Sequence, residues 1–319
     1  MKSVVIGVDI GGTFSKFGIV DREGNILVEG SIPTDTFENV VDYQKSLYEA
    51  IEKAIAPIKS DIDIKGIGFG APNANYYKGT IESAANLKWK GVVHFAELFK
   101  KYYNFPIVLT NDANAAAIGE GLYGGAKGMQ DYIVITLGTG LGSGIVANGK
   151  MIYGFDGFAG ELGHVMVEPN GRKCGCGKLG CLETYASATG IKRTVFKLLC
   201  DMTDESELRQ YNFYELTSEK IYEAALRNDP VALKAFEFTG NILGAKLADA
   251  VAFSTPEAIF LFGGLAKAGE VLFKPIRESF EANLLPIYRN KIKILPSGLQ
   301  DKNVAVMGAS ALIWKELGN

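Results

Sequence analysis

A strand, a glycine-rich turn and a second strand follow one another twice in this chain, about 125 to 127 residues apart. The first copy covers residues 4–20 and the second covers residues 132–146. The turn residues are Gly11, Gly12 and Thr13 in the first copy and Gly138, Thr139 and Gly140 in the second. A repeat of this length indicates duplication. We therefore expect an α/β fold with two related domains facing each other across a cleft.

The segments after the first copy alternate between helical and strand patterns. Apolar residues recur at helical spacing over 37–55, and short apolar runs at 64–69 and 107–110 predict strands. This βαβ rhythm indicates a largely parallel sheet, and such sheets bind ligands at the carboxyl ends of their strands.

The domain boundary is expected in the stretch 119–128, where glycine is frequent and a hinge would form easily. We expect an N-terminal α/β domain at 1–120 and a C-terminal α/β domain at 121–302. The last helix, at about 303–319, is expected to pack back on the N-terminal domain.

The two glycine turns are candidate phosphate-binding loops, because glycine lets backbone N–H groups approach a phosphate closely. A single such turn is usually an ordinary hairpin, and the second copy favours a nucleotide lying between the two. Asp9, at the end of the first strand, could hold Mg²⁺ through water or could bond its own turn. Gly263 and Gly264 follow a strand at 257–262 and could accept an adenine ring or form a tight turn.

Asp112 follows the predicted strand at 107–110 and precedes an alanine-rich helix. Phosphoryl transfer to a hydroxyl group needs a carboxylate that accepts the proton and aims the nucleophile. A carboxylate at a strand end is well placed for this. Alternatively, Asn111 or Asp112 simply caps the helix, and position alone leaves both interpretations open.

Residues 157–183 contain one of the two histidines, His164, and three of the four cysteines, Cys174, Cys176 and Cys181. Three thiolates and an imidazole suit a closed tetrahedral zinc site of the structural kind. Free thiols or a disulfide are the alternative. Glu161 and Glu183 flank the ligands, and we expect the metal to fix their positions. The fourth cysteine, Cys200, lies in an apolar helical pattern and is expected in the core.

The motif G-x-x-G-E-x-G-H followed by C-x-C-G-x-x-G-C-x-E resembles the signature of the ROK family, which contains sugar kinases and sugar-responsive repressors. The resemblance implies a duplicated actin-like and hexokinase-like (ribonuclease H-like) ATPase fold. It also implies that Asp112, within N-D-A-N-A-A-A, is the catalytic base. One departure is Asn73, since many members have glycine after the proline.

The resemblance further implies ATP-dependent phosphorylation of a hexose on its primary hydroxyl, with glucose the first expectation. N-acetylmannosamine, N-acetylglucosamine, allose and fructose are alternatives. The cofactors implied are ATP, Mg²⁺ and structural Zn²⁺, and a homodimer is the family expectation. The implied sugar-binding residues are Gly70, Asn86, Asn111, Asp112, Glu161, His164 and Glu183. The implied ATP-binding residues are Asp9, Gly11, Gly12, Thr13, Gly138, Thr139, Gly140, Gly263 and Gly264.

Composition bears on the remaining alternatives. The net charge is −3, which gives no general attraction to nucleic acid or anionic membranes. No apolar run reaches the roughly 18 residues that span a bilayer, so we expect a cytoplasmic protein. A sugar-sensing repressor is less expected, because the first strand begins at Val4 without a preceding helix-turn-helix. An acetate-kinase-like enzyme is a weaker alternative, because the two braced carboxylates suit a polyol.

Overall fold

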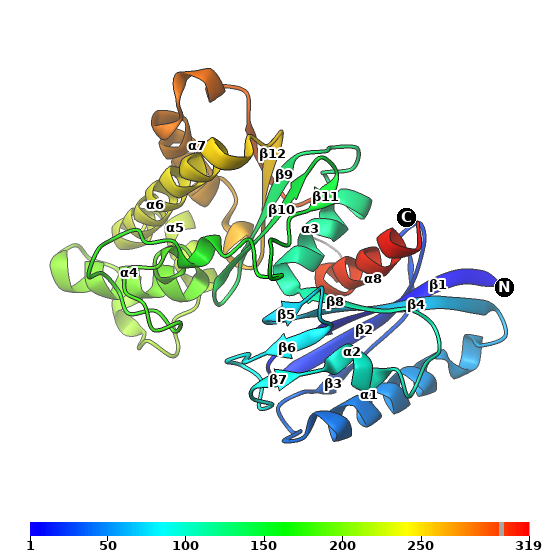
Figure 1. The fold of residues 1–319 in the computed structure, drawn as a ribbon. Helices are drawn as coiled ribbons and strands as arrows, with labels where there is room; N and C mark the ends of the chain where they lie inside the picture. The colour runs from blue at the N-terminus through cyan, green and yellow to red at the C-terminus, as the bar shows by residue number, and fades with distance from the viewer. Residues whose placement is uncertain (300–302, 319) are drawn as a thin grey trace. The chain divides into compact units, whose positions relative to one another are not determined.

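Two five-stranded sheets with the same topology form the framework of the computed structural model, which describes residues 1–299 and 303–318 (Figure 1). Their strand orders are β3-β2-β1-β4-β8 and β11-β10-β9-β12-β13. In each sheet an antiparallel hairpin, β1–β2 or β9–β10, is continued by two parallel strands. The repeated sequence pattern thus forms equivalent hairpins. A small third sheet contains β5, β6 and β7.

The strands of the first sheet are β1 (Lys2–Ile10), β2 (Phe14–Asp21), β3 (Ile26–Pro33), β4 (Ile62–Ala71) and β8 (Ile107–Asn111). Those of the second are β9 (Tyr132–Leu137), β10 (Leu141–Ala147), β11 (Lys150–Met151), β12 (Ala258–Phe262) and β13 (Lys293–Pro296). The third sheet comprises β5 (Ala74–Asn75), β6 (Thr80–Glu82) and β7 (Val92–Val93). The α-helices are α1 (Val40–Ile55), α2 (Phe95–Phe99), α3 (Asp112–Tyr123), α4 (Ala188–Asp201), α5 (Ser218–Leu226), α6 (Pro230–Ser254), α7 (Glu270–Asn283) and α8 (Val304–Leu317).

The chain forms two compact units. Unit 1 comprises Met1–Gly128, Met151–Ala159 and the C-terminal residues from Gly298 onward, and unit 2 comprises Met129–Lys150 and Gly160–Ser297. The predicted domain limits at residues 120 and 302 stay a prediction.

Helix α8 completes unit 1 by packing on β1, β4 and α3 (Figure 1). Most of its residues are buried, including Met307, Leu312 and Ile313. The approach is so close that a Cβ atom at Gly68 would lie 2.0 Å from the carbonyl oxygen of Ala309. A side chain on the sheet at that position would force the helix away. On the other face, α1 buries Tyr43 and other residues against the same sheet.

Unit 2 has its own core beneath the second sheet. Helices α6 and α7 pack along each other and supply its buried phenylalanines, Phe236, Phe273 and Phe280. Asp229 caps α6 by accepting hydrogen bonds from the backbone N–H groups of Val231 and Ala232. This core supports the hairpin that contains Gly138, Thr139 and Gly140.

The domain junction expected within 119–128 stays a prediction. This stretch begins inside α3, which continues to Tyr123, and the first part of unit 1 ends at Gly128. Gly119 serves close helix packing there, because a Cβ atom would lie 2.9 Å from the Cα atom of Gly308. Cys200, expected in the core, is exposed in the last turn of α4.

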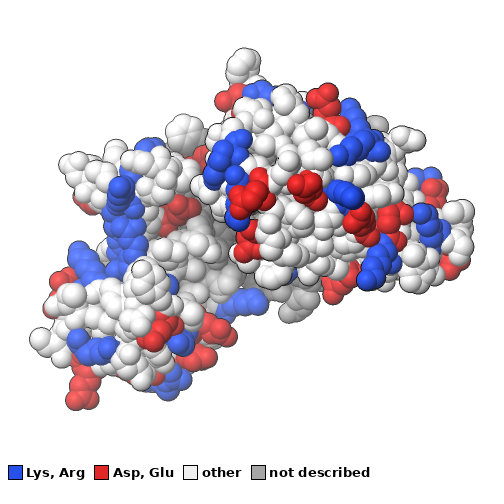
Figure 2. All heavy atoms as spheres, turned by 90° about the horizontal axis from the view of Figure 1, so that it is seen from below, with Lys and Arg blue, Asp and Glu red and all other residues white. Residues whose placement is uncertain are grey.

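Acidic and basic side chains are interspersed over the face shown in Figure 2. Within residues 1–299 and 303–318, none of the helices combines the length and the apolar character that crossing a membrane requires.

Candidate functional site

Four candidate residues of unit 1 meet at the carboxyl ends of neighbouring strands. Asp9 of β1 pairs with Gly70 of β4, and the next position of β4, Ala71, pairs with Asn111 of β8. A Cβ atom at Gly70 would lie 3.8 Å from the Cα atom of Asp112 and 4.0 Å from Oδ1 of Asp9. The parallel strand order therefore places the Asp9 carboxylate on one side of Gly70 and the Asp112 carboxylate on the other.

Protein atoms around Asp112 raise the pKa of its carboxyl group above the ordinary value by desolvation, although solvent still reaches the side chain. For Asp9, burial and then the charge of Asp112 raise the pKa to about 7, against a smaller opposing effect of Lys16. Raised carboxyl pKa values in a cluster of this kind are typical of functional sites.

Asn111 and Asp112 both bond the first turn of α3. Asn111 is the N-cap of α3, and its Oδ1 accepts a hydrogen bond from the backbone N–H of Ala113 at 2.8 Å. Oδ1 of Asp112 accepts from the same N–H group, also at 2.8 Å. Because Asn111 already caps the helix, Asp112 is not required for that purpose.

The first glycine hairpin contacts the loop that contains Asn86. A Cβ atom at Gly12 would lie 2.9 Å from the backbone oxygen of Asn86 and 3.2 Å from its Cβ atom. Beneath the hairpin, the hydroxyl of Tyr43 donates to Oγ of Ser15, which in turn bonds Thr34, both at 2.7 Å. The backbone N–H of Thr34 donates to the carbonyl of Thr13. A buried polar chain thus supports the hairpin.

The second glycine hairpin contacts Glu183 in unit 2. A Cβ atom at Gly140 would lie 2.2 Å from Oε2 of Glu183, and the same oxygen accepts from the backbone N–H of Leu141 at 3.1 Å. Gly263, with a φ of +109°, packs its Cα atom against the backbone of Leu137 beside the hairpin. Around Gly264 no atom would meet a Cβ atom within 4 Å, so its backbone is accessible.

The four predicted metal ligands of unit 2 converge. The ligand atoms of His164, Cys174, Cys176 and Cys181 all lie within 4.8 Å of one another. The sulfur atoms of Cys176 and Cys181 are 3.7 Å apart, far beyond the roughly 2.05 Å of a disulfide. A tetrahedral zinc ion with Zn–S bonds of about 2.3 Å separates two sulfur ligands by about 3.8 Å. The cluster therefore fits zinc in both its donor atoms and its dimensions.

The three thiols of the cluster differ in pKa. Burial raises the pKa of the Cys174 thiol to about 12 and raises that of Cys181 as well, whereas at Cys176 hydrogen bonds outweigh burial and lower the pKa. Metal ions bind cysteine as thiolate, so a cation is what would stabilise the ionised form in this environment.

Both flanking carboxylates contact the cluster. Nδ1 of His164 lies 3.7 Å from the sulfur of Cys174, while Nε2 lies 3.8 Å from Oε2 of Glu161. Oε1 of Glu183 accepts from the Cys174 thiol at 3.5 Å. The imidazole thus has one nitrogen toward the thiols and the other toward Glu161. An ion held by the four ligands would fix both carboxylates.

Arg172 connects the cysteine segment to α4 and to the turn before it. The sequence pattern did not predict this role. Its guanidinium group donates to the carbonyls of Thr184 and Gly190 and to Oγ1 of Thr194. It also stacks on the ring of Tyr185, with 4.4 Å between the guanidinium carbon and the ring centroid. The only signal in the sequence was a basic residue in a glycine-rich segment, which is ordinarily exposed.

The candidate residues fall into two sets, and each set belongs to one unit. Unit 1 contains Asp9, Gly11, Gly12, Thr13, Gly70, Asn86, Asn111 and Asp112. Unit 2 contains Gly138, Thr139, Gly140, Glu161, His164, Cys174, Cys176, Cys181, Glu183, Gly263 and Gly264.

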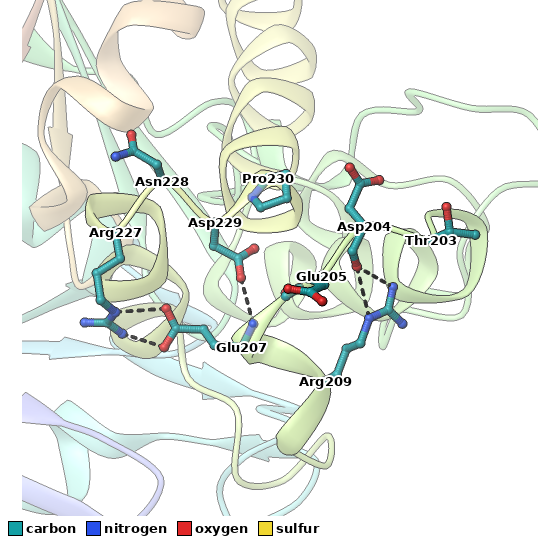
Figure 3. A pocket seen from close by; sticks show the side chains of 10 residues that line it. Thr203, Asp204, Glu205, Glu207, Arg209, Arg227, Asn228, Asp229 and Pro230 are labelled. Atoms are coloured by element: carbon teal, nitrogen blue, oxygen red, sulfur yellow. Dashed lines mark hydrogen bonds and ion pairs between the residues drawn. The ribbon is translucent and has the colours of Figure 1, made fainter.

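A pocket of about 620 Å³ in unit 2 lies apart from these residues, between residues 203–209 and 227–230 (Figure 3). None of the predicted sugar or ATP residues lines it. Its two arginines are engaged by the protein: Arg227 pairs with Glu207, and Arg209 donates to the carbonyl of Asp204 (Figure 3). The Arg227–Glu207 pair joins the two segments that line the pocket, one between α4 and α5 and the other between α5 and α6.

Comparison with known proteins identifies similar chains. A glucokinase of Halalkalibacterium halodurans is 37% identical over 88% of this chain and 86% of its own length. A xylose repressor of Caldicellulosiruptor bescii is 29% identical over 98% of this chain and 78% of its own length. The crystal structure of a ROK family glucokinase from Streptomyces griseus, in complex with glucose and AMPPNP, is 34% identical. It covers 97% of this chain and 98% of that one, with a TM-score of 0.80.

The match to a family model extends over nearly the whole sequence. The model is that of the ROK family, and it covers residues 5–316. It therefore includes both glycine hairpins, Asp112 and the cysteine cluster. This chain belongs to the ROK family.

Proposed function

We propose that this protein transfers the γ-phosphoryl group of ATP to the primary hydroxyl of a hexose, and that the hexose is glucose. The class of reaction, an ATP-dependent sugar kinase, follows from family membership and from the glucokinase relatives. Glucose is supported by the same relatives, of which the Streptomyces griseus enzyme was crystallised with glucose and AMPPNP.

The observation that carries the proposal is the pair of carboxylates at the strand ends of unit 1. Asp112 is solvent-accessible, has a raised pKa and is not needed as a helix cap. A raised pKa makes a carboxylate a better proton acceptor. In the proposed reaction Asp112 accepts the proton of the sugar hydroxyl while the hydroxyl oxygen bonds to the γ-phosphorus. The bond from that phosphorus to the bridging oxygen breaks, leaving ADP.

The other candidate residues have binding roles in this proposal. The backbone of Gly11, Gly12 and Thr13 and that of Gly138, Thr139 and Gly140 would bind the ATP phosphates, with adenine against Gly263 and Gly264. Mg²⁺, when bound, neutralises charge on the phosphates, and Asp9 is the residue that would hold it. Asn86, Asn111, Glu161, His164 and Glu183 would bond the remaining sugar hydroxyls, with Gly70 leaving space for the ring.

The cysteine cluster is proposed to bind structural zinc. The four ligands leave no open position, so the ion would orient rather than react. Its contacts with Glu161 and Glu183 support a role in presenting these carboxylates to the sugar. Charged acceptors of this kind form strong hydrogen bonds to hydroxyl groups.

The test is ATP consumption by purified protein with Mg²⁺ over a panel of sugars. The panel contains glucose, fructose, allose, N-acetylglucosamine, N-acetylmannosamine and, because of the repressor relative, xylose. We expect turnover with glucose to exceed that with every other sugar. If folded, zinc-loaded protein turns over none of them but binds one, the chain is a sugar-sensing regulator and the kinase proposal is wrong.

Asp112→Asn tests the assignment of the base. General-base catalysis contributes about 10² to 10⁴ in rate, so kcat should fall by that factor. Sugar affinity measured by calorimetry should remain, because the amide keeps the shape of the side chain. Asn111→Ala serves as the comparison, since it removes the helix cap and a proposed sugar contact but leaves the carboxylate. Retained turnover in Asp112→Asn would exclude Asp112 as the base.

A further inference from the structure

The loop that contains Asn86 is closed at its base but has few contacts at its centre. It connects β6 to β7, and the backbone N–H of Ser83 donates to the carbonyl of Gly91 at 2.8 Å. Leu87 and Trp89 are buried, whereas Ala85 and Asn86 are exposed. Side-chain packing therefore does not fix the part of the loop that contains Asn86.

Lys90 supplies the missing support. Its ammonium group donates to the carbonyl of Leu87 at 2.6 Å and to those of Ala84 and Ala85 at 3.3 Å each. An ammonium group has three N–H donors, so the three carbonyls match its full capacity. These three carbonyl groups thus surround the ammonium group of Lys90, which follows Asn86 by four residues.

The backbone of this loop needs such a group. Three carbonyl oxygens that converge on one point repel one another unless a donor lies between them. The only backbone hydrogen bond across the turn, from Leu87 N–H to the carbonyl of Ala84, is long at 3.4 Å. Ser83, at the entrance, adopts a φ of +51°, which costs energy for a residue with a Cβ atom. The buried side chains of Ala84 and Leu87 anchor the two ends of the turn, and Lys90 supplies the hydrogen bonds that hold its carbonyl groups together.

The position of Asn86 also affects the first glycine hairpin, because Gly12 packs directly on its backbone oxygen. A displacement of the loop would therefore move the residue proposed to bind the sugar and remove a contact of a loop proposed to bind ATP.

We propose that Lys90 is a positioning residue: its ammonium group holds residues 84–87 in one conformation and thereby fixes Asn86 for binding the sugar. This inference rests on the proposed function, in which Asn86 bonds a sugar hydroxyl. Lys90 itself is not a catalytic residue.

Lys88 provides a matched control on the same loop. It pairs with Glu38, and both side chains are exposed. Ion pairs of this kind on the surface contribute little. Lys88→Met removes the same charge from the same loop as Lys90→Met, so general electrostatic effects of losing a lysine are equal in the two variants.

The kinetic test compares Lys90→Met, Lys90→Arg, Lys88→Met and Asn86→Ala with the wild type. Loss of charge-assisted hydrogen bonds should raise KM for the sugar in Lys90→Met by roughly fivefold to fiftyfold. KM for ATP should rise less, and kcat should change least. Lys90→Arg, which keeps the charge and donors, should restore part of the affinity. Lys88→Met should match the wild type.

Hydrogen exchange supplies a readout that does not depend on activity. In Lys90→Met the amides of Ser83 and Leu87 should exchange faster than in the wild type and in Lys88→Met, while α1 keeps its protection.

Faster exchange together with raised KM for the sugar supports the inference. Raised KM with unchanged exchange overturns it, since Lys90 would then contact a substrate directly. Unchanged KM in Lys90→Met, with raised KM in Asn86→Ala, overturns it and leaves the proposed function intact. No turnover by the wild type overturns both.

Discussion

Asp9 places a half-buried carboxyl group in unit 1, next to Asp112. Its pKa is about 7 in the folded chain, against 3.8 for an unperturbed aspartate. Between these two pH values the folded state keeps a proton that the unfolded state has released. The free energy of unfolding therefore falls as the pH rises through this window, and the loss is complete above about pH 7.

Asp9→Asn should remove this dependence, because the amide does not ionise. In protein without Mg²⁺ and nucleotide, its stabilising effect should be larger at pH 8 than at pH 5, by about 1 to 3 kcal/mol. Urea denaturation at the two pH values measures the difference. Asp35→Asn, an exposed position of the same unit, is the control. An equal effect of Asp9→Asn at both pH values would contradict the raised pKa.

Residues with a distinctive chemical type were predictable from the sequence, and residues defined by their contacts were not. His164 and the three cysteines stand out by rarity and spacing alone. Tyr43 and Lys90 act on loops through contacts that only the folded chain reveals. A weak signal existed for Ser15, a polar residue at an inward-facing position of a strand that is otherwise apolar inside.

The structure explains why asparagine can replace the glycine of the family pattern at position 73. It has a φ of +51°, a region that glycine adopts freely and asparagine tolerates better than most residues. Its amide also donates to the carbonyl of Glu82 at 3.1 Å. Asparagine thus keeps the backbone conformation that glycine would allow and adds a bond to β6.

At the scale of elements, the cysteine segment is held by the four proposed metal ligands and by Arg172. Short bridges connect Met166 with Cys181 and Lys173 with Leu179. The segment lacks extended secondary structure, and its two ends are the 3₁₀ turns η2 (Leu162–His164) and η3 (Leu182–Thr184). Arg172, these bridges and backbone hydrogen bonds such as that from the Leu182 N–H to the Val165 carbonyl hold the segment, and an ion would add the bonds that connect its four ligands.

Cys176→Ser should lower the zinc content from one ion per chain and weaken sugar binding at the same time. ATP binding should change less, because the other contacts of the second hairpin remain. Metal content is measured by mass spectrometry and affinity by calorimetry.

Cys200→Ser is the matched control, since Cys200 is also exposed but lies outside the cluster. It should leave zinc and sugar binding unchanged. If Cys176→Ser loses zinc but binds sugar as the wild type does, the ion does not position the carboxylates.

Element order was predictable because helical and strand periodicity are local properties of the sequence. The strand from Ile107, the helix after Asn111 and the hairpin at Gly138 occur where the pattern placed them. The glycines of 119–128 that suggested a hinge include one whose role is set by a non-local contact. Gly119 is needed for close contact with Gly308, almost two hundred residues later, and a glycine count cannot reveal this.

At the scale of the whole molecule, unit 1 is assembled from three parts of the chain, and α8 is the last of them. Its buried residues fill the space between β1, β4 and α3. A chain ending after residue 303 should therefore lose the cooperative fold of unit 1 and keep that of unit 2.

Hydrogen exchange checks this expectation. Peptides from β1, β4 and α1 should lose protection in the shortened chain, whereas peptides from α6 and α7 should keep it. Adding a synthetic peptide of residues 304–317 should restore part of the protection in unit 1. Full protection of β1 and β4 in the shortened chain would show that α8 is dispensable.

The same arrangement has a consequence during synthesis. The ribosome completes the first sheet and α3 roughly 180 residues before it reaches α8. At a translation rate of about 5 to 20 residues per second, the apolar face that α8 later covers stays uncovered for roughly 10 to 35 s. The last strand of unit 2 ends at Pro296, before α8 begins at Val304, so the sheet and helices of unit 2 are all synthesised before unit 1 has its last helix, and unit 2 can fold first. The nascent chain would then offer chaperones an unfinished N-terminal half, although most proteins fold in the order in which they are translated.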